Sequence, residues 1–267
     1  MALGTGSVVQ TETTFAGNPA KVTLTGPISL VHHSLVTKDY ELLQFHAAAA
    51  LQLQFDHQRR ATSDNHRLVA SPYNEELHLP SDNRLIASPY NEELHLLDLR
   101  RLDTPNQLLA KALTILKPIR EDYATAPYID SFNWQEVIDF LRDMAAAEGY
   151  RWKKQKFYVV TFRSKLYPDI DLQRLHDLDV HAHQEAVASG GLLKYWFGTK
   201  DQSHQNLATC LWRSREDARA AGAGQRHKVA RAATGELYDT IIFTALKLVI
   251  DDDASSWQIS DWTKEDV

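Results

Sequence analysis

The chain has 267 residues, of which 24% are charged and 43% are apolar, a composition typical of a folded globular protein. Its net charge of −6 offers no basic surface to a phosphate backbone, which argues against nucleic acid as a partner. No run approaches the roughly 18 apolar residues that a membrane-spanning helix requires, and the first 20 residues lack the pattern of a secretory signal. We therefore expect a cytoplasmic protein with no membrane partner, and the single Cys210 fits a reducing compartment.

The N-terminal region has a weak pattern. Residues 1–25 contain few large apolar side chains, and we expect them to be disordered. A short strand at 27–36 and a helix at 40–55 follow, the helix being favoured by four consecutive alanines. We assign residues 26–150 to one N-terminal region that packs on the remainder of the chain.

A duplicated segment lies within this region. Residues 67–79 read RLVASPYNEELHL and residues 84–96 read RLIASPYNEELHL, so Val69 and Ile86 are their only difference. The unit is too short for a solenoid repeat. We interpret it as a recent local duplication, or as a product of splicing or of the gene model. We expect one copy to occupy a strand-like position while the other loops out, with the acidic triplets in solvated turns rather than acting as ligands.

Two helices are predicted after the duplication. The first begins at Thr104-Pro105, where proline suits the first helical turn, and ends at Pro118. The second begins after Asn133, which forms a capping-box pattern with Glu136, and ends at Gly149. Apolar residues recur at helical spacing in both, so we expect a helical layer that packs on the following segment.

From residue 151 onward the pattern predicts strand, helix, strand, strand, helix and strand. The expected elements are a strand at 157–164, a helix at 171–189, a hairpin of strands at 192–197 and 206–212, a broken helix at 215–234 and a strand at 238–250. This order predicts an α+β fold with a ferredoxin-like βαββαβ module at 151–250, and an acidic tail at 251–267.

The last predicted strand is apolar on both faces. Ile242 and Leu246 point to one side, while Ile241 and Phe243 point to the other. Two helices can cover only one face of a four-stranded antiparallel sheet. A second copy of the sheet, or the helices before residue 150, must therefore cover the other face.

Polar residues interrupt the apolar face of the helix at 171–189. His176, Asp179 and His183 fall inside the apolar arc, where polar side chains must either satisfy one another or face a cavity. A buried imidazole oriented by a carboxylate is the arrangement of a general base, so we predict these three as catalytic residues. The alternative is that Asp179 pairs with one histidine in a purely structural contact. His181 is expected in surface ion pairs.

The sheet and the second helix supply candidate residues for binding a substrate beside this trio. These are Tyr158 (or Phe157), Tyr195, Trp196, Trp212, His227 and Tyr238. No metal is expected, because His176 and His183 lie two turns apart, whereas a shared zinc prefers adjacent turns. No cofactor is expected: haem is a minor option, and the sequence has no phosphate loop, GxSxG or CxxC motif. Cys210 is expected to be a buried small apolar side chain.

Five stretches resemble an uncharacterised family of fungal proteins with no assigned activity: LLDLRRLDTP (96–105), DYATAPY (122–128), FNW (132–134), SGGLLKYWFG (189–198) and NLATCLWRS (206–214). The resemblance covers roughly residues 95–262. Residues 157–250 also resemble the dimeric α/β-barrel superfamily, which includes antibiotic-biosynthesis monooxygenase-like proteins. That resemblance implies a homodimer whose sheets pair, with a pocket between helices and sheet, but it selects no reaction.

Two functional hypotheses follow. The first is a cofactor-independent enzyme of cyclase, isomerase or monooxygenase type that acts by acid–base chemistry on a hydrophobic or aromatic metabolite. The second is a non-catalytic dimeric module that binds a small ligand or a protein. A closed pocket with His176 or His183 pointing into it would favour the enzyme.

Overall fold

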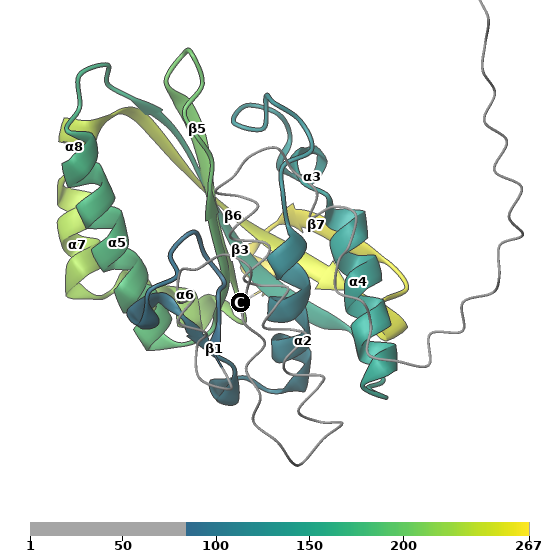
Figure 1. Cartoon of the computed structure of the whole chain (residues 1–267). Helices are drawn as coiled ribbons and strands as arrows, with labels where there is room; N and C mark the ends of the chain where they lie inside the picture. The colour runs from purple at the N-terminus through teal and green to yellow at the C-terminus, as the bar shows by residue number, and fades with distance from the viewer. Residues whose placement is uncertain (1–83, 267) are drawn as a thin grey trace, which may run out of the picture.

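The computed structural model describes residues 84–266. The predicted strand at 27–36, the helix at 40–55, the predicted disorder of 1–25 and the first duplicated copy at 67–79 lie outside the described residues. Within the described part the structure has a five-stranded antiparallel sheet with helices on both of its faces, and a separate two-stranded sheet (Figure 1).

The elements follow the predicted order, with short additions. The helices are α2 (Thr104–Ala112), α3 (Tyr128–Ser131), α4 (Trp134–Ala147), α5 (Leu172–Ser189), α6 (Arg215–Gly222), α7 (Gln225–Ala232) and α8 (Thr234–Leu237). The strands are β1 (Arg84–Leu85), β2 (Leu97–Asp98), β3 (Gln155–Leu166), β4 (Leu192–Phe197), β5 (Gln205–Trp212), β6 (Tyr238–Ile250) and β7 (Trp257–Asp261).

The strand order of the main sheet confirms the predicted fold class. It runs β4-β5-β3-β6-β7, and every neighbouring pair is antiparallel. The first four strands, with α5 between β3 and β4 and α6–α7 between β5 and β6, form the ferredoxin-like βαββαβ module. The predicted break in the second helix is also present, because α6 ends at Gly222 and α7 begins at Gln225.

One face of the sheet is covered by α5 and α6, with α7 packed beside α5 (Figure 1). The apolar cluster on this face draws Tyr158 and Val160 from β3, and Ala186 and Ala221 from α5 and α6. Even-numbered residues of β3 point to this side, since successive side chains of a strand alternate between faces.

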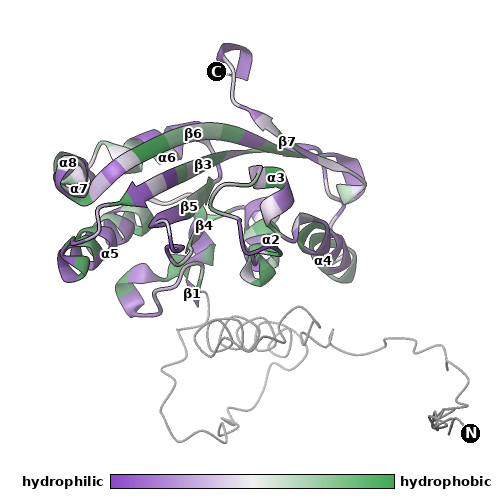
Figure 2. Cartoon of the chain, turned by 90° about the horizontal axis from the view of Figure 1, so that it is seen from above, coloured by the Kyte–Doolittle hydropathy of each residue, from purple (hydrophilic) through white to green (hydrophobic). Residues whose placement is uncertain are grey.

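The opposite face is covered by α2 and α4 of the same chain (Figure 1). Odd-numbered β3 residues such as Phe157 and Val159 pack there with Leu109 of α2 and Leu141 of α4, all at most 1% exposed. Of the two candidates for covering the second apolar face, the N-terminal helices therefore occupy it. Figure 2 shows the same layers along another direction.

A loop reinforces this second layer through Arg163 of β3. Its guanidinium donates hydrogen bonds to the backbone carbonyls of Tyr123, Ala124 and Ala126. The hydroxyl of Tyr123 in turn donates to the carbonyl of Thr199, 2.8 Å away, just after β4. The loop at residues 123–126 is thus held against β3 by the side chain of Arg163.

The C-terminal tail is more ordered than a purely acidic extension would suggest. Residues Trp257–Asp261 form β7, which pairs with β6 from Leu246 to Ile250. The first half of β6 lies beyond this pairing, and Ile242 and Phe243 there are 60% and 58% exposed. In the part of the chain described, no helix combines the length and apolarity needed to cross a bilayer.

Candidate functional site

Helix α5 carries the three predicted catalytic residues, His176, Asp179 and His183. Its start is capped by Asp171, which accepts a hydrogen bond from the backbone N–H of Arg174. It ends at Gly190, whose φ of +86° is the left-handed region that favours glycine. His183 is only 5% exposed and Asp179 is half-buried, but His176 lies exposed one turn before Asp179. The expectation that all three side chains face inward is therefore wrong for His176.

The carboxylate of Asp179 lies between two tyrosine hydroxyls. Tyr90 donates to Oδ2 at 2.5 Å, and Tyr195 of β4 donates to Oδ1 at 2.6 Å. Both are hydrogen bonds to a charged acceptor, which are shorter and stronger than neutral ones. The predicted carboxylate–imidazole bond is replaced by this pair of phenol–carboxylate bonds.

The imidazole of His183 faces a second histidine that the sequence did not indicate. Nδ1 of His95 and Nδ1 of His183 are 2.7 Å apart, and Nε2 of Gln184 lies 3.2 Å from Nε2 of His95. An amide nitrogen can only donate, so His95 accepts at Nε2 and carries its proton at Nδ1. His95 therefore donates to His183, which leaves the His183 proton on Nε2.

Burial sets the protonation of these groups. It raises the pKa of the Asp179 carboxyl above its ordinary value, although the hydroxyls of Tyr195 and Tyr90 act in the opposite direction. Burial lowers the pKa of His183 to about 3, and the neighbouring His95 adds to that effect. Burial also lowers the pKa of His95. Both imidazoles are therefore neutral near pH 7, and their mutual hydrogen bond requires the accepting ring of His183 to be unprotonated at Nδ1.

Aromatic rings enclose this network. The Tyr90 ring lies 4.7 Å from the ring of His95, 5.3 Å from His183 and 6.1 Å from Phe197, measured between centroids. His183 also stacks on Tyr195 at 5.2 Å. The half-buried carboxylate of Asp179 thus lies beside a group of aromatic rings, with both oxygens bonded to tyrosine hydroxyls.

Tyr90 and His95 come from the second duplicated copy, residues 84–96. This segment reaches the site because β1 pairs with β2, and because the backbone N–H of Tyr195 donates to the carbonyl of Ala87 at 2.8 Å. His95 ends a single 3-10 turn, η2 (Glu93–His95), that packs against α5. The only sequence signal for this role was a tyrosine and a histidine retained in both copies.

The predicted binding residues divide between the two faces of the sheet. Tyr195, Tyr158 and Trp212 lie on the α5 face, all within one apolar cluster. Trp196 lies on the other face, where its ring contacts Phe132 at 5.0 Å between centroids. Its assignment to the site was wrong, because adjacent residues of a strand point to opposite faces.

The remaining predicted residues lie around α5. Nδ1 of His227 is 2.8 Å from Oε2 of Glu185, so α7 is bound to α5 at this point. His181 is exposed, and Glu185 is engaged by His227. Burial, aided by the nearby charge of Asp179, raises the pKa of Tyr238 to about 12. Cys210 is half-buried against the same apolar cluster.

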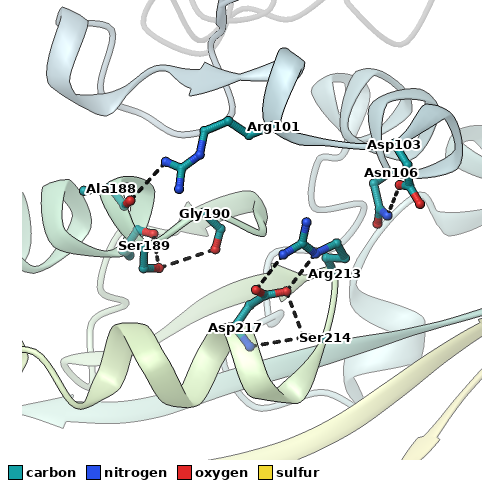
Figure 3. Close-up of polar contacts among 10 residues, drawn as sticks. Arg101, Asp103, Asn106, Ala188, Ser189, Gly190, Arg213, Ser214 and Asp217 are labelled. Atoms are coloured by element: carbon teal, nitrogen blue, oxygen red, sulfur yellow. Dashed lines mark hydrogen bonds and ion pairs between the residues drawn. The ribbon is translucent and has the colours of Figure 1, made fainter.

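A separate cleft of about 220 Å³ lies at the C-terminal end of α5. Its walls are the second duplicated copy with the segment after it, and the turn at Gly190-Gly191. Figure 3 shows Arg101 extending across this region to donate to the carbonyl of Ala188 at 3.0 Å. Nearby, Arg213 forms a two-pronged ion pair with Asp217 at 2.8 and 2.9 Å. The cleft does not include the predicted trio.

Across residues 84–266, no group of three or more His, Cys, Asp or Glu side chains is arranged to hold a metal ion. The carboxylate oxygens of Asp179 are instead engaged by hydroxyls.

Comparison with known proteins identifies a family, and two of the similar solved structures are described below. The family model described as PB2B2.08-like matches residues 86–261. The UPF0643 protein PB2B2.08 of Schizosaccharomyces pombe is 35% identical over 205 residues, which span 73% of this chain and 84% of that protein.

Among solved structures, Rv0793 from Mycobacterium tuberculosis is 21% identical, covering 34% of this chain and 92% of its own, with a TM-score of 0.31. A putative antibiotic biosynthesis monooxygenase from Nitrosomonas europaea is 11% identical, covering 40% of this chain and 91% of its own, with a TM-score of 0.30.

Proposed function

The chain belongs to the PB2B2.08-like family, and we propose that it acts by acid–base chemistry, without a cofactor, on a small hydrophobic or aromatic molecule held between α5 and the sheet. The observation that carries this proposal is the half-buried carboxylate of Asp179 between the hydroxyls of Tyr90 and Tyr195. A carboxyl with a raised pKa inside an aromatic shell is a typical general base or acid.

Asp179 is the proposed proton-transfer group. Tyr195 holds Oδ1 at 2.6 Å, so Oδ2 is the oxygen that exchanges a proton with a substrate. The hydroxyl of Tyr90 marks the position that a substrate hydroxyl would take if residues 84–96 moved away from α5. A phenol or an enol bound there would lie beside Phe197 and the neutral ring of His183.

The other predicted residues take supporting roles in this proposal. Tyr195 and Tyr238 line the site near Asp179. Tyr158 and Trp212 form the apolar floor on the sheet. His183 contributes a neutral imidazole, His176 lies at the exposed rim, and His227 fixes α7 to α5.

A metabolite extract of the host tests this proposal. The purified protein is incubated with the extract, and mass spectrometry measures which compounds are retained and which are converted. Asp179→Asn keeps the shape of the side chain but cannot accept a proton, so we expect retention without conversion. His181→Gln, on the exposed side of α5, is the matched control and should convert as the wild type does.

The outcomes separate the two functional classes. Conversion by the wild type that Asp179→Asn loses supports the enzyme. A compound retained by both but converted by neither supports the alternative, a non-catalytic ligand-binding module. No retention by either protein overturns both small-molecule functions and leaves protein binding as the alternative. A Soret band in the purified protein would favour haem binding instead.

We also propose that the protein forms a homodimer and lies in the cytoplasm. Because α2 and α4 cover the face that a second sheet would need, a dimer requires another surface. For it we propose the first half of β6, which lies beyond the pairing with β7 and exposes Ile242 on one face of the strand and Phe243 on the other. Light scattering measures the mass of the wild type and of Phe243→Lys in solution. We expect a dimer for the wild type and a monomer for the variant. A monomeric mass for the wild type would overturn the proposed dimer.

A further inference from the structure

We propose that the site that holds residues 84–96 on α5 and β4 can also be filled by residues 67–79, so the two duplicated copies are alternative occupants of one site. This inference concerns which segment fills the site, and it does not rest on the chemistry proposed above.

The second copy is bound through groups spread along its length. Leu85 pairs with Leu97 across β1 and β2, and Ala87 accepts a backbone hydrogen bond from Tyr195. Tyr90 and His95 then bind Asp179 and His183. The side chains that become buried are Leu85, Ile86, Ala87, Ser88, Tyr90, His95 and Leu96, each at most 7% exposed.

The first copy carries the same groups at the same spacing. Its counterparts to the buried side chains are Leu68, Val69, Ala70, Ser71, Tyr73, His78 and Leu79. Only Val69 differs, and it replaces Ile86, which packs against Leu96 in a small cluster. Loss of one buried methyl group from isoleucine disfavours a packed state by about two- to tenfold. The second copy is therefore the major occupant and the first copy the minor one.

The chain connection permits this exchange. The copies are offset by 17 residues, so with the first copy in place Leu79 takes the position of Leu96, next to Leu97. Residues 80–96 would then form a loop whose two ends are neighbours. The entropy lost in closing a loop grows only logarithmically with its length, so this extra loop is a small penalty.

Two deletions provide a matched pair of single-copy chains. Removing residues 67–83 leaves only the second copy, and removing residues 80–96 leaves only the first. The two products differ at one residue, Ile86 against Val69. We expect both to fold, with the isoleucine chain melting slightly higher. Failure of the second product to fold, while the first product folds, would overturn the proposal.

The decisive test introduces Tyr90→Ala with His95→Ala in two backgrounds. In the chain that lacks 67–83 no replacement exists, so the melting temperature should fall steeply. In the full chain the first copy substitutes for the damaged one, so the fall should be less than a third as large. Equal falls in both backgrounds would show that the first copy cannot fill the site.

Controls in the full chain complete the test. Tyr73→Ala with His78→Ala should leave the melting temperature unchanged, because the second copy already fills the site. All four substitutions together in the full chain should reproduce the steep fall in melting temperature. If that chain does not fold at all, the full chain with only Tyr90→Ala and His95→Ala should still fold. Rescue that disappears on dilution would mean that the first copy of another molecule fills the site, which overturns exchange within one chain.

Discussion

The two faces of the main sheet are built on different principles. On the face covered by α2 and α4, apolar side chains such as Leu109, Leu141 and Phe157 form the larger cluster, although α2 and β4 also bury Lys111 and Lys194. On the face covered by α5, a carboxylate, two imidazoles and two phenols are buried within a smaller apolar cluster. The first face supplies stability through apolar burial. The second buries polar groups that are tolerated because each has a partner.

Strand β4 serves both faces at once. Tyr195 donates to Asp179 on the α5 side, and Trp196 packs on Phe132 on the other side. The strand geometry alone separates these two adjacent aromatic residues. A residue's face, more than its type, therefore decides whether it contributes to the core or to the site.

The largest expected effect lies on the α2–α4 face. Leu141→Ala removes a fully buried side chain and leaves a cavity, so we expect the free energy of unfolding to fall by about 3–5 kcal/mol. Denaturant unfolding measures this loss. Asp143→Ala, on the exposed side of the same helix, is the control and should stay within about 0.5 kcal/mol. A loss below about 1 kcal/mol for Leu141→Ala would contradict the division between the two faces.

A smaller effect is expected on the α5 face from Tyr195→Phe. The variant keeps the ring but removes one of the two hydrogen bonds to the Asp179 carboxylate, worth about 1.5–3 kcal/mol. The same unfolding measurement applies. Tyr167→Phe, whose side chain is 41% exposed, should change little. Equal losses for the two variants would mean that the bond to Asp179 contributes nothing to stability.

The pH dependence of stability sharpens the contrast further. The pKa of His183 is lowered to about 3 in the folded state, against an ordinary value near 6.5, so between these pH values the unfolded chain binds the extra proton. Stability from His183 is thus fully present above pH 6.5 and is lost as the pH falls toward 3, at up to about 1.4 kcal/mol per pH unit.

Comparison of the wild type with His183→Gln isolates the contribution of His183 to the pH dependence of stability. The raised pKa of Asp179 acts with the opposite sign, since the folded carboxyl retains its proton and its contribution falls as pH rises, but both proteins share it. We expect the wild type to lose more stability than His183→Gln between pH 6.5 and 5. If the free energy of unfolding changed equally with pH in both proteins over that range, the His183 ring would have to be exposed to water.

The smallest effect is expected at a solvent-exposed ion pair that joins α5 and α8. Nη1 of Arg174 lies 2.8 Å from Oε2 of Glu236, with both side chains about half exposed. Solvent screens such a pair, so Arg174→Ala should change the free energy of unfolding by no more than about 0.5 kcal/mol. A loss comparable to that of Tyr195→Phe would mean that surface charge stabilises this fold as much as the buried network does.

The fold could be predicted where local patterns were strong. The βαββαβ order and the bounds of β4 and β6 followed from strand alternation and helical spacing, and the helix break appeared at its glycines. The fifth strand, β7, was not predicted, because Trp257–Asp261 contains acidic and polar residues and pairs only along the edge of β6. Edge pairing depends on a tertiary neighbour, which no local pattern reveals.

The site could be predicted only in part. Helical projection correctly indicated that Asp179 and His183 lie among apolar positions. It placed His176 inward as well, because projection cannot show where the covering layer ends. Tyr90 and His95 were missed because they precede Asp179 and His183 by 89 and 88 residues, and only the folded chain brings them together.

Arg163 has a mechanical consequence for the molecule. One planar guanidinium gathers three backbone carbonyls of residues 123–126, and Tyr123 passes that restraint to Thr199 at the β4–β5 hairpin. A lysine ammonium keeps the charge but lacks the flat fork that serves several acceptors at once. The loop at residues 123–126 is therefore bound to both the central strand and the hairpin through one cation and Tyr123, whereas β3 and β5 are already paired directly.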